Sequence, residues 1–302
     1  MGWRAIRHIA AVLGLLCCAG LAFADDGCAS SPDAAPSDAS ASDAASADDC
    51  VAVGRWNLSV ALGAGVRTNP VVHAKDIPLV VVPQFSYYGK RFFIDNLDPG
   101  VTLFEGETNT LSLIASPGYD RVFFYRSDLQ NVFVGGATSI AANGEATFAR
   151  TNNPQVFQQI PPRSRKVTYL AGPEWTFKYA RVTGQIDYLH EITGHNHGDE
   201  IRAALGFPLG RLAGSWTANV GVTWKSAAIV NYYYGSSVNI YEGGWALNPF
   251  GKIGYSRPLS GKWKLEAFVH CERLGNAIAD SPIVRGHYVT TAFVGVTYVI
   301  HK

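Results

Sequence analysis

Two histidines close together in the sequence are the residues whose type and spacing come nearest to a metal site. His195 and His197 lie in a segment that ends with Asp199 and Glu200. Alternate residues of a strand share a face, and imidazoles with nearby carboxylates can bind zinc or copper. The segment is rich in glycine, however, which is typical of a turn. We therefore expect a solvated loop here, with no bound metal and no cofactor.

A second group with acid–base potential lies nearer the C-terminus. His270 would share one strand face with Glu266 and Glu272, because side chains two residues apart in a strand point the same way. Such a group could transfer protons inside a barrel. Lys264 belongs to the same face, and a ladder of structural ion pairs explains this mixture of charges better than catalysis does.

The motifs of common enzyme classes do not occur in the sequence. There is no Gly-x-Ser-x-Gly segment, and the ordinary serines and histidines are scattered, whereas Ser/His/Asp catalysis needs a nucleophile held against a base. No glycine pattern follows a strand and opens a helix, as nucleotide-binding loops do. We expect a protein without catalytic activity.

An aromatic run, Tyr232-Tyr233-Tyr234, is a third candidate. Its rings could stack on sugars, since they offer apolar faces with polar edges. Rings at a strand end are more often interfacial residues of a membrane protein, and that is the role we expect.

The elements that would position these residues begin after an export signal. A basic start, an apolar run over residues 9–16 and a small-x-small site at residues 22–24 predict a signal peptide over residues 1–24. A lipoprotein is the competing interpretation, because Cys17 and Cys18 lie nearby. The residue before Cys17 is leucine, not the small residue that lipid attachment favours, so the cleaved signal is the better prediction.

Residues 25–53 form a low-complexity tract of Ala, Ser, Asp and Pro with seven aspartates and no Lys or Arg. Such a tract cannot bury a core, and we expect it to be disordered. Cys28 and Cys50 bracket the tract. In an oxidising periplasm they could close a disulfide loop, worth about 3 kcal/mol in the chain-entropy model. Two incidental cysteines in a flexible linker are the equal alternative. If the disulfide forms, Cys271 remains unpaired.

The composition suits the wall of a barrel. Charged residues make up only 16% of the chain, against about 25% in soluble domains. The net charge is +1 without a basic stripe, which gives no support to a nucleic-acid partner. No run of about 18 apolar residues follows the signal, so membrane helices are excluded. An exported chain of this kind is either soluble or a closed barrel.

Segments of about ten residues with alternating polarity decide between these two classes. In residues 216–224 every even position is apolar, with a tryptophan at each end, as expected of a lipid-facing strand with rings at both headgroup levels. Residues 263–272 and 291–300 alternate in the same way. The three segments predict an all-β fold: a transmembrane, antiparallel, up-and-down β-barrel over residues 54–302.

The predicted strands number about twelve, and an even number lets the sheet close. They cover residues 55–66, 78–88, 90–104, 109–116, 166–179, 181–190, 199–207, 216–224, 227–235, 246–257, 263–272 and 291–300. Residues 117–165 contain Gly, Asn and Pro pairs and predict loops, with a short helix or hairpin around residues 129–149. This segment is long enough to fold into the barrel and block it.

The polar faces of the strands supply the candidate site residues, because the face opposite the lipid lines the lumen. The candidate lumen-facing residues are Glu200, Arg202, Lys264, Glu266, His270 and Glu272. Cys271 falls on the apolar face, where a small hydrophobic residue is expected rather than a reactive thiol.

Four short parts of the sequence match a known family. They are Tyr232-Tyr233-Tyr234-Gly235, Leu274 with Ser281-Pro282-Ile283-Val284, Gly295-Val296-Thr297-Tyr298, and Leu170-Ala171-Gly172-Pro173-Glu174-Trp175. Through them, residues 55–302 resemble the MipA/OmpV family of outer-membrane proteins. The sequence departs from the family in its acidic tract and in its end, Ile300-His301-Lys302, where such barrels usually end in an aromatic residue. The assembly signal at that terminus is therefore imperfect.

The resemblance implies a location in the outer membrane of a Gram-negative cell and a role without catalysis. It implies a scaffold for murein synthesis and turnover that binds a lytic transglycosylase and a bifunctional penicillin-binding protein. Other members are described as porin-like or as surface binding proteins. A porin-like channel or a binding protein for small solutes is thus the alternative, and an outer-membrane enzyme is the least supported hypothesis.

Overall fold

The computed structural model describes residues 54–125, 165–235 and 241–301. The predicted signal peptide, the acidic tract with Cys28 and Cys50, and the helix or hairpin expected around residues 129–149 lie outside the described residues.

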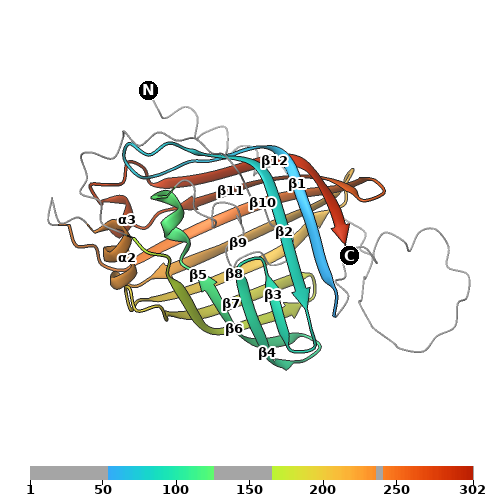
Figure 1. Ribbon diagram of the computed structural model, residues 1–302, viewed down its shortest axis with the longest axis horizontal. Coiled ribbons are helices and arrows are strands. Elements are labelled where there is room, and N and C mark those ends of the chain that lie inside the picture. The colour runs from blue at the N-terminus through green and yellow to red at the C-terminus, as the bar shows by residue number, and fades with distance from the viewer. Residues whose placement is uncertain (1–53, 126–164, 236–240, 302) are drawn as a thin grey trace, which may run out of the picture. The chain divides into compact units, whose positions relative to one another are not determined.

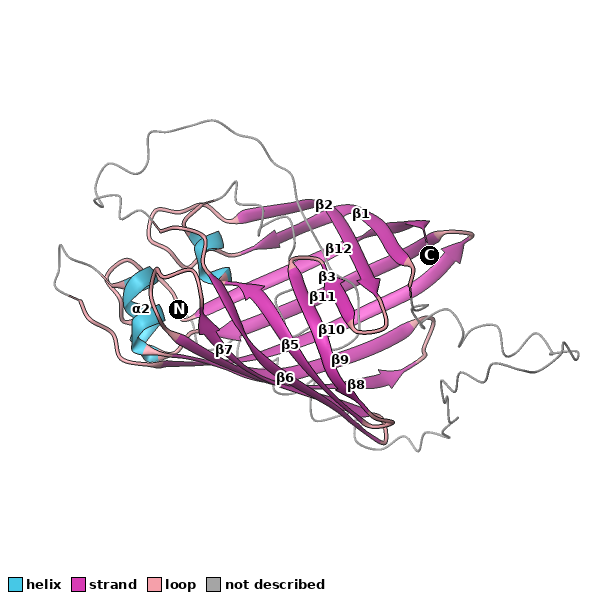
Figure 2. Ribbon diagram, turned by 60° about the horizontal axis from the view of Figure 1, so that its bottom comes forward, coloured by secondary structure: helices cyan, strands magenta, loops and turns pink. Residues whose placement is uncertain are grey.

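The described residues form a closed barrel of twelve antiparallel strands in which each strand pairs with its neighbours in sequence and the first strand pairs with the last (Figures 1 and 2). The strands are β1 (Trp56–Arg67), β2 (Ile77–Tyr88), β3 (Phe92–Asp95), β4 (Asp98–Glu105), β5 (Asn109–Pro117), β6 (Tyr169–Tyr179), β7 (Val182–Glu191), β8 (Asp199–Gly210), β9 (Ser215–Lys225), β10 (Ala246–Ser260), β11 (Trp263–Arg273) and β12 (Tyr288–His301). The fold class predicted from the sequence is confirmed.

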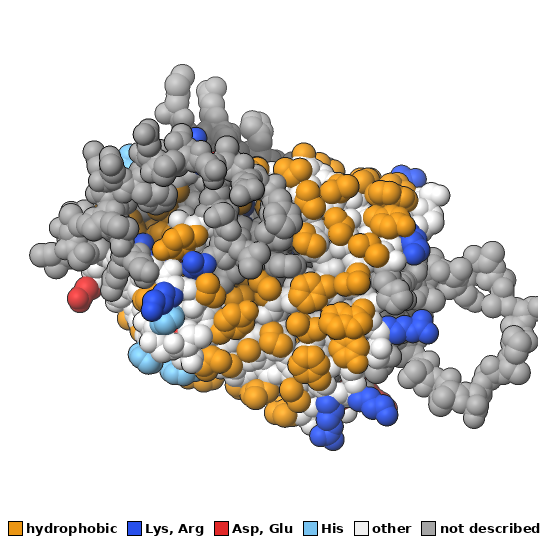
Figure 3. All heavy atoms as spheres, in the orientation of Figure 1, with side chains coloured by type: hydrophobic (Ala, Val, Ile, Leu, Met, Phe, Trp, Pro, Cys, Tyr) orange, Lys and Arg blue, Asp and Glu red, His pale blue; other side chains and the backbone are white. Residues whose placement is uncertain are grey.

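Alternation along each strand sorts the side chains between two environments. In β9, Val220 is 46% exposed on the outer face, whereas its neighbour Asn219 is 6% exposed on the inner face. The outer surface carries a band of apolar side chains over the strands (Figure 3). The inner surface holds most of the buried polar groups. Apolar outside and polar inside is the arrangement that a barrel in lipid requires.

Four tryptophans near one end of the barrel each lie against another aromatic ring. Trp56 packs on Tyr87, Trp175 on Phe177, Trp216 on Tyr255 and Trp263 on Tyr298, with ring centroids 4.7 to 5.1 Å apart. Amphipathic rings prefer the level of the lipid headgroups. They form an aromatic girdle, so the chain is an outer-membrane β-barrel, as the sequence predicted.

The two ends of the barrel differ in the length of their connections. At the end where β1 begins and β12 finishes, which we call the turn end, the connections are residues 89–91, 106–108, 180–181, 211–214 and 261–262. At the other end, the loop end, they are residues 68–76, 118–168, 192–198, 226–245 and 274–287. Outer-membrane barrels place short turns in the periplasm and long loops outside the cell, so we assign the turn end to the periplasm.

The prediction of one strand over residues 90–104 is wrong. The structure forms two short strands there, β3 and β4, joined at Asn96 and Leu97. Asn96 has a φ of 51°, a left-handed conformation that asparagine tolerates well. Its backbone N–H donates to the Phe85 carbonyl at 2.8 Å, and its Oδ1 accepts the Phe85 N–H at 3.1 Å. The Asn96 side chain thus binds a backbone N–H of β2 just beyond the end of β3.

The prediction of a strand over residues 227–235 is also wrong, because these residues form helix α2 (Ala227–Tyr234). Its buried residues are Ile229, Val230, Tyr233 and Tyr234, a spacing that places them on one side of a helix. Tyr233 and Tyr234 are buried inside the protein, so they are not the interfacial residues that the sequence predicted.

Two further short helices lie at the loop end with α2. They are the 3-10 helix η3 (Tyr119–Phe123) and α3 (Asn276–Ala279). None of the helices in the described residues is long and apolar enough to cross a bilayer.

Candidate functional site

The lumen-facing pair on β8 is buried and forms an ion pair. Arg202 donates from Nε to Glu200 Oε1 at 2.5 Å, and both residues are almost fully buried. Arg202 also donates to the Ser116 hydroxyl on β5 at 3.0 Å. Because β5 and β8 are not neighbours in the sheet, this bond crosses the interior.

Further acids surround this pair on the same side of the barrel. Gln185 on β7 donates from Nε2 to Glu174 on β6 at 2.9 Å and to Asp187 at 3.0 Å. Asp187 is fully buried and lies opposite Arg202 in the register of β7 and β8. The amide and the guanidinium together hold carboxylates that would otherwise be costly to bury.

The candidates on β11 have partners that differ from the predicted ion-pair ladder. Glu266 accepts the Thr297 hydroxyl at 2.6 Å, and Glu272 accepts the Asn248 amide at 2.7 Å. His270 lies beside the Phe250 ring, with centroids 5.5 Å apart, and Lys264 is half-buried on the same face. Neutral partners thus bind the two carboxylates, and within the described residues no hydrogen bond joins His270 to either of them.

A buried contact at the loop end fastens η3 to the barrel wall. Lys225, at the end of β9, donates from Nζ to Asp120 Oδ2 at 2.5 Å, and Glu200 lies 3.9 Å from the same Nζ. The Tyr234 hydroxyl of α2 donates to the other oxygen of Asp120 at 2.7 Å. Burial and the Asp120 carboxylate raise the pKa of Tyr234 well above its ordinary value, so the tyrosine stays a donor. We call Asp120, Lys225 and Tyr234 the latch.

Other hydrogen bonds connect α2 to the segments around it. Arg165 donates from Nε to the Tyr233 carbonyl at 2.8 Å, and the Tyr233 and Thr168 hydroxyls lie 2.8 Å apart. The Ser281 hydroxyl donates to the Tyr234 carbonyl at 2.6 Å. Hydrogen bonds therefore connect the helix to the segment just before β6 and to the connection between β11 and β12.

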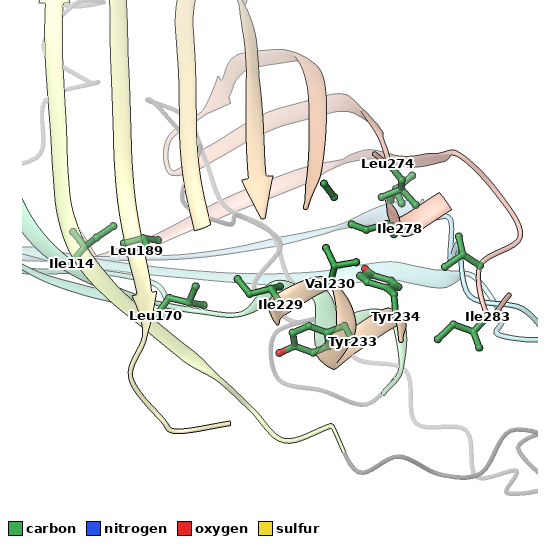
Figure 4. Close-up of a cluster of buried hydrophobic side chains, with 13 residues drawn as sticks. Ile114, Leu170, Leu189, Ile229, Val230, Tyr233, Tyr234, Leu274, Ile278 and Ile283 are labelled. Atoms are coloured by element: carbon green, nitrogen blue, oxygen red, sulfur yellow. The ribbon is translucent and has the colours of Figure 1, made fainter. Parts of the chain in front are cut away.

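A hydrophobic cluster spans the barrel at the same end (Figure 4). The wall contributes inward-facing residues from β5, β6, β7, β10 and β12. The others come from α2, α3 and the segments just before and after α3. The members are Ile114, Leu170, Leu189, Ile229, Val230, Tyr233, Tyr234, Ala246, Leu274, Ile278, Ile283, Val284 and Val289. We call this cluster with the latch the cap. Because its members come from β5–β7 and from β10 and β12, the cluster joins separate parts of the barrel wall at this level.

His195 and His197 lie in the connection between β7 and β8. The Glu191 carboxylate, at the end of β7, accepts the backbone N–H groups of Thr193, His195, Asn196 and His197 at 2.7 to 3.1 Å. The carboxylate therefore orders the turn through its backbone. In the described residues no three His, Cys, Asp or Glu side chains gather as metal ligands would.

Cys271 is exposed on the outer face of β11 as a free thiol. Its position agrees with the apolar face expected from the sequence, although the neighbour there is lipid, not a protein core.

Sequence reasoning missed Asp120 and Lys225, the two charged residues of the latch. Lys225 lies on the inward face of β9, an even number of residues after Asn219. The alternating pattern of β9 could therefore have identified Lys225 as a lumen-facing residue. Asp120 lies in a segment without any periodicity, and only the three-dimensional contact shows its role. Taken together, the lumen and the cap contain paired and hydrogen-bonded charges, which is the arrangement of a structural interior.

The sequence of this chain matches one protein family over most of its length. The model of the family, described as MltA-interacting protein MipA, matches residues 60–300. Two relatives carry the name MltA-interacting protein, one from Escherichia coli (strain K12) and one from Shigella flexneri. Each is 24% identical to this chain over 266 residues, which covers 82% of this chain and 92% of the relative.

Similar solved structures are outer-membrane porins at low identity. A porin refined at 1.8 Å resolution is 10% identical with a TM-score of 0.32, and the match covers 82% of this chain and 100% of that chain. An anion-selective porin from Comamonas acidovorans is 8% identical with a TM-score of 0.32, covering 82% of this chain and 99% of that chain. Neither score supports a conclusion about solutes.

Proposed function

The chain belongs to the MipA family, and on that premise we propose that it is a non-catalytic scaffold of the outer membrane for murein synthesis and turnover. The proposed partner is a lytic transglycosylase of the MltA kind, after the name that the relatives carry. A bifunctional penicillin-binding protein is the second proposed partner. Both would bind at the turn end, because that end faces the periplasm, where murein lies.

The observation that carries this proposal is the cap. Side chains from five strands and two helices pack across the lumen, and the latch holds η3 against β9. A channel needs a lumen through which solutes pass, whereas a scaffold needs only a rigid wall and accessible ends. In the described residues, side chains at the loop end of the lumen pack against one another and do not line an open path. This packing favours the scaffold.

Binding of the soluble MltA homologue from the same organism tests the scaffold directly. The full-length barrel would be reconstituted in lipid nanodiscs, and association would be followed by biolayer interferometry. We expect saturable binding, and an unrelated outer-membrane barrel of similar size in the same nanodiscs is the control. Binding no stronger than to that control would refute the proposed partner.

The alternative is a porin-like channel or a binding protein for small solutes. The polar lumen favours it, since Arg202, Glu200 and Asp187 line one side of the interior. Arg202, however, binds Glu200 and Ser116. Glu200 also lies 3.9 Å from Lys225 of the cap. Ion conductance of the reconstituted protein separates the two functions.

A further inference from the structure

Three neighbouring turns at the turn end share one composition. Lys178 and Tyr179 end β6, and Arg181 lies in the turn between β6 and β7. The turn between β8 and β9 carries Arg211 and Leu212. Each places basic side chains beside a large apolar one, and both turns lie close together because β7 pairs with β8.

The third turn repeats the pattern. Arg257, Leu259 and Lys262 lie where β10 passes into β11, and β9 pairs with β10. Residues 177–182, 208–215 and 257–263 contain no Asp or Glu. We call these three turns the basic arc. Its bases are Lys178, Arg181, Arg211, Arg257 and Lys262, and all five are exposed.

The apolar side chains of the arc project outward instead of packing. Tyr179 is 80% exposed, Leu212 84% and Leu259 50%, and the first two values exceed those of the other exposed large hydrophobic residues described. Lys and Arg side chains gather at this end beyond the apolar band (Figure 3). Exposed apolar groups cost free energy in water, so a patch that keeps them beside charges is typical of an interaction site.

The rim beside the arc carries acids. The next turn around the rim, between β4 and β5, carries the exposed acids Glu105 and Glu107. The turn between β2 and β3 carries Lys90 and Arg91, on the far side of those acids. These two acids therefore separate the arc from the basic turn between β2 and β3.

We infer that the basic arc is the docking surface for an acidic face of a periplasmic protein, with Tyr179 and Leu212 as apolar anchors. This inference rests on the proposed scaffold function and assigns it a place on the molecule. Tyrosine and arginine are the residue types that most often dominate binding at protein interfaces. Charge complementarity selects the partner, because a group of exposed bases attracts a carboxylate-rich surface.

Lipid headgroups are the competing occupant, and the position of Tyr179 disfavours them. Tyr179 follows the girdle residue Trp175 by four residues along β6, which is about 13 Å along a strand at roughly 3.3 Å per residue. Its ring therefore lies past the girdle, toward the aqueous side. A lipid phosphate would use the bases but not an apolar ring in that place.

Charge reversal of the arc tests the inference. The variant Lys178→Glu, Arg181→Glu, Arg211→Glu, Lys262→Glu would be compared with the wild type for binding of the soluble MltA homologue to nanodiscs. The matched control, Lys90→Glu with Arg91→Glu, reverses exposed bases outside the arc. Heat-modifiable gel mobility shows that each variant folds. We expect about a tenfold or greater loss of affinity at low salt for the arc variant and less than about a twofold change for the control.

A second variant separates the apolar anchors from the charges. Tyr179→Ser with Leu212→Ser keeps every base, and we expect it to weaken binding through faster dissociation, whereas charge reversal slows association. The loss caused by charge reversal should shrink at about 0.5 M salt, because the Debye length falls with ionic strength.

The outcomes distinguish the arc from the function. If the wild type binds and the arc variant binds equally well, the arc is not the docking surface, while the scaffold proposal stands. If the wild type itself does not bind, the scaffold proposal fails and the inference fails with it. If the arc variant keeps its affinity for the protein but loses a preference for nanodiscs containing phosphatidylglycerol, the arc is a lipid headgroup site and the docking inference is wrong.

Discussion

Lys225 and Asp120 form a buried ion pair in the latch. Both side chains are buried, and Glu200 adds a second carboxylate 3.9 Å from the lysine. A buried ion pair adds little stability compared with an apolar pair, but removal of one partner strands the other charge. Removal of the lysine alone should therefore lower the free energy of unfolding more than replacement of both charged residues.

We expect Lys225→Met to lower the free energy of unfolding by about 3 to 5 kcal/mol, because it leaves Asp120 without its cation. The double variant Lys225→Met, Asp120→Asn should lose less than the single one, since Glu200 keeps Arg202 at 2.5 Å. Urea unfolding in detergent micelles, followed by tryptophan fluorescence, measures both. Lys262→Met, an exposed change, is the control at less than about 0.5 kcal/mol. A double variant that is the least stable would contradict the stranded-charge explanation.

Glu191 shows how one carboxylate can order a loop without binding a metal. It accepts four backbone N–H groups from Thr193, His195, Asn196 and His197, and hydrogen bonds to a charged group contribute about 1.5 to 3 kcal/mol each. We expect Glu191→Ala to speed hydrogen exchange of these amides by at least about tenfold. Glu107→Ala, in an exposed turn, should leave them unchanged. Exchange at the wild-type rate would show that the turn is held by its backbone alone.

At the scale of elements, alternation predicted most strands because lipid and lumen impose opposite demands on neighbouring residues. Residues 216–224 and 263–272 satisfy both demands and became β9 and β11. The two failures have different causes. Residues 227–235 are an apolar run that one sequence cannot distinguish as a strand or a buried helix, and the cap supplied the apolar surface that made it α2. The predicted count of twelve was right because this lost strand offset the division of residues 90–104 into two.

The division into β3 and β4 depends on Asn96, whose φ of 51° and side-chain bond to Phe85 close the hairpin. We expect Asn96→Gly to be slightly destabilising, since glycine keeps the left-handed φ but loses the side-chain bond. Asn96→Val should be worse by about 1 to 3 kcal/mol, because a β-branched residue is strained at positive φ. Urea midpoints of the two variants give the order. Equal midpoints would show that the turn is not under this constraint.

The candidate site was less predictable than the fold. The phase of β8 and β11 identified Glu200, Arg202 and Glu266 as inward-facing candidates, and the structure buries all three. Their partners were not predictable, because Ser116 and Thr297 reach them across the barrel or from a neighbouring strand. Periodicity gives the direction of a side chain, whereas its contacts depend on the register and curvature of the whole sheet.

For the whole molecule, the two ends have separate physical characters. The loop end concentrates burial, with a hydrophobic cluster and a latch that share Tyr234. The turn end concentrates exposure, with the basic arc beyond the aromatic girdle. A rigid barrel between them keeps the arc in place, because closed sheets have no free edge that could rearrange. The docking proposed for the turn end therefore depends on the stability of the barrel wall.

The packing of the cap at the loop end predicts a low ion conductance for the whole barrel. If packed side chains fill the lumen at the cap, the wild-type protein in planar bilayers should show no steady ohmic current. Opening a path requires the cluster to unpack, so the variant Tyr234→Ala, which removes a buried ring and the latch donor together, should give transient openings. Cys271→Ser changes only the outer face and should behave as the wild type. A steady current through the wild type would mean that solutes pass the cap, and the porin-like function would then replace the scaffold as the better account of this barrel.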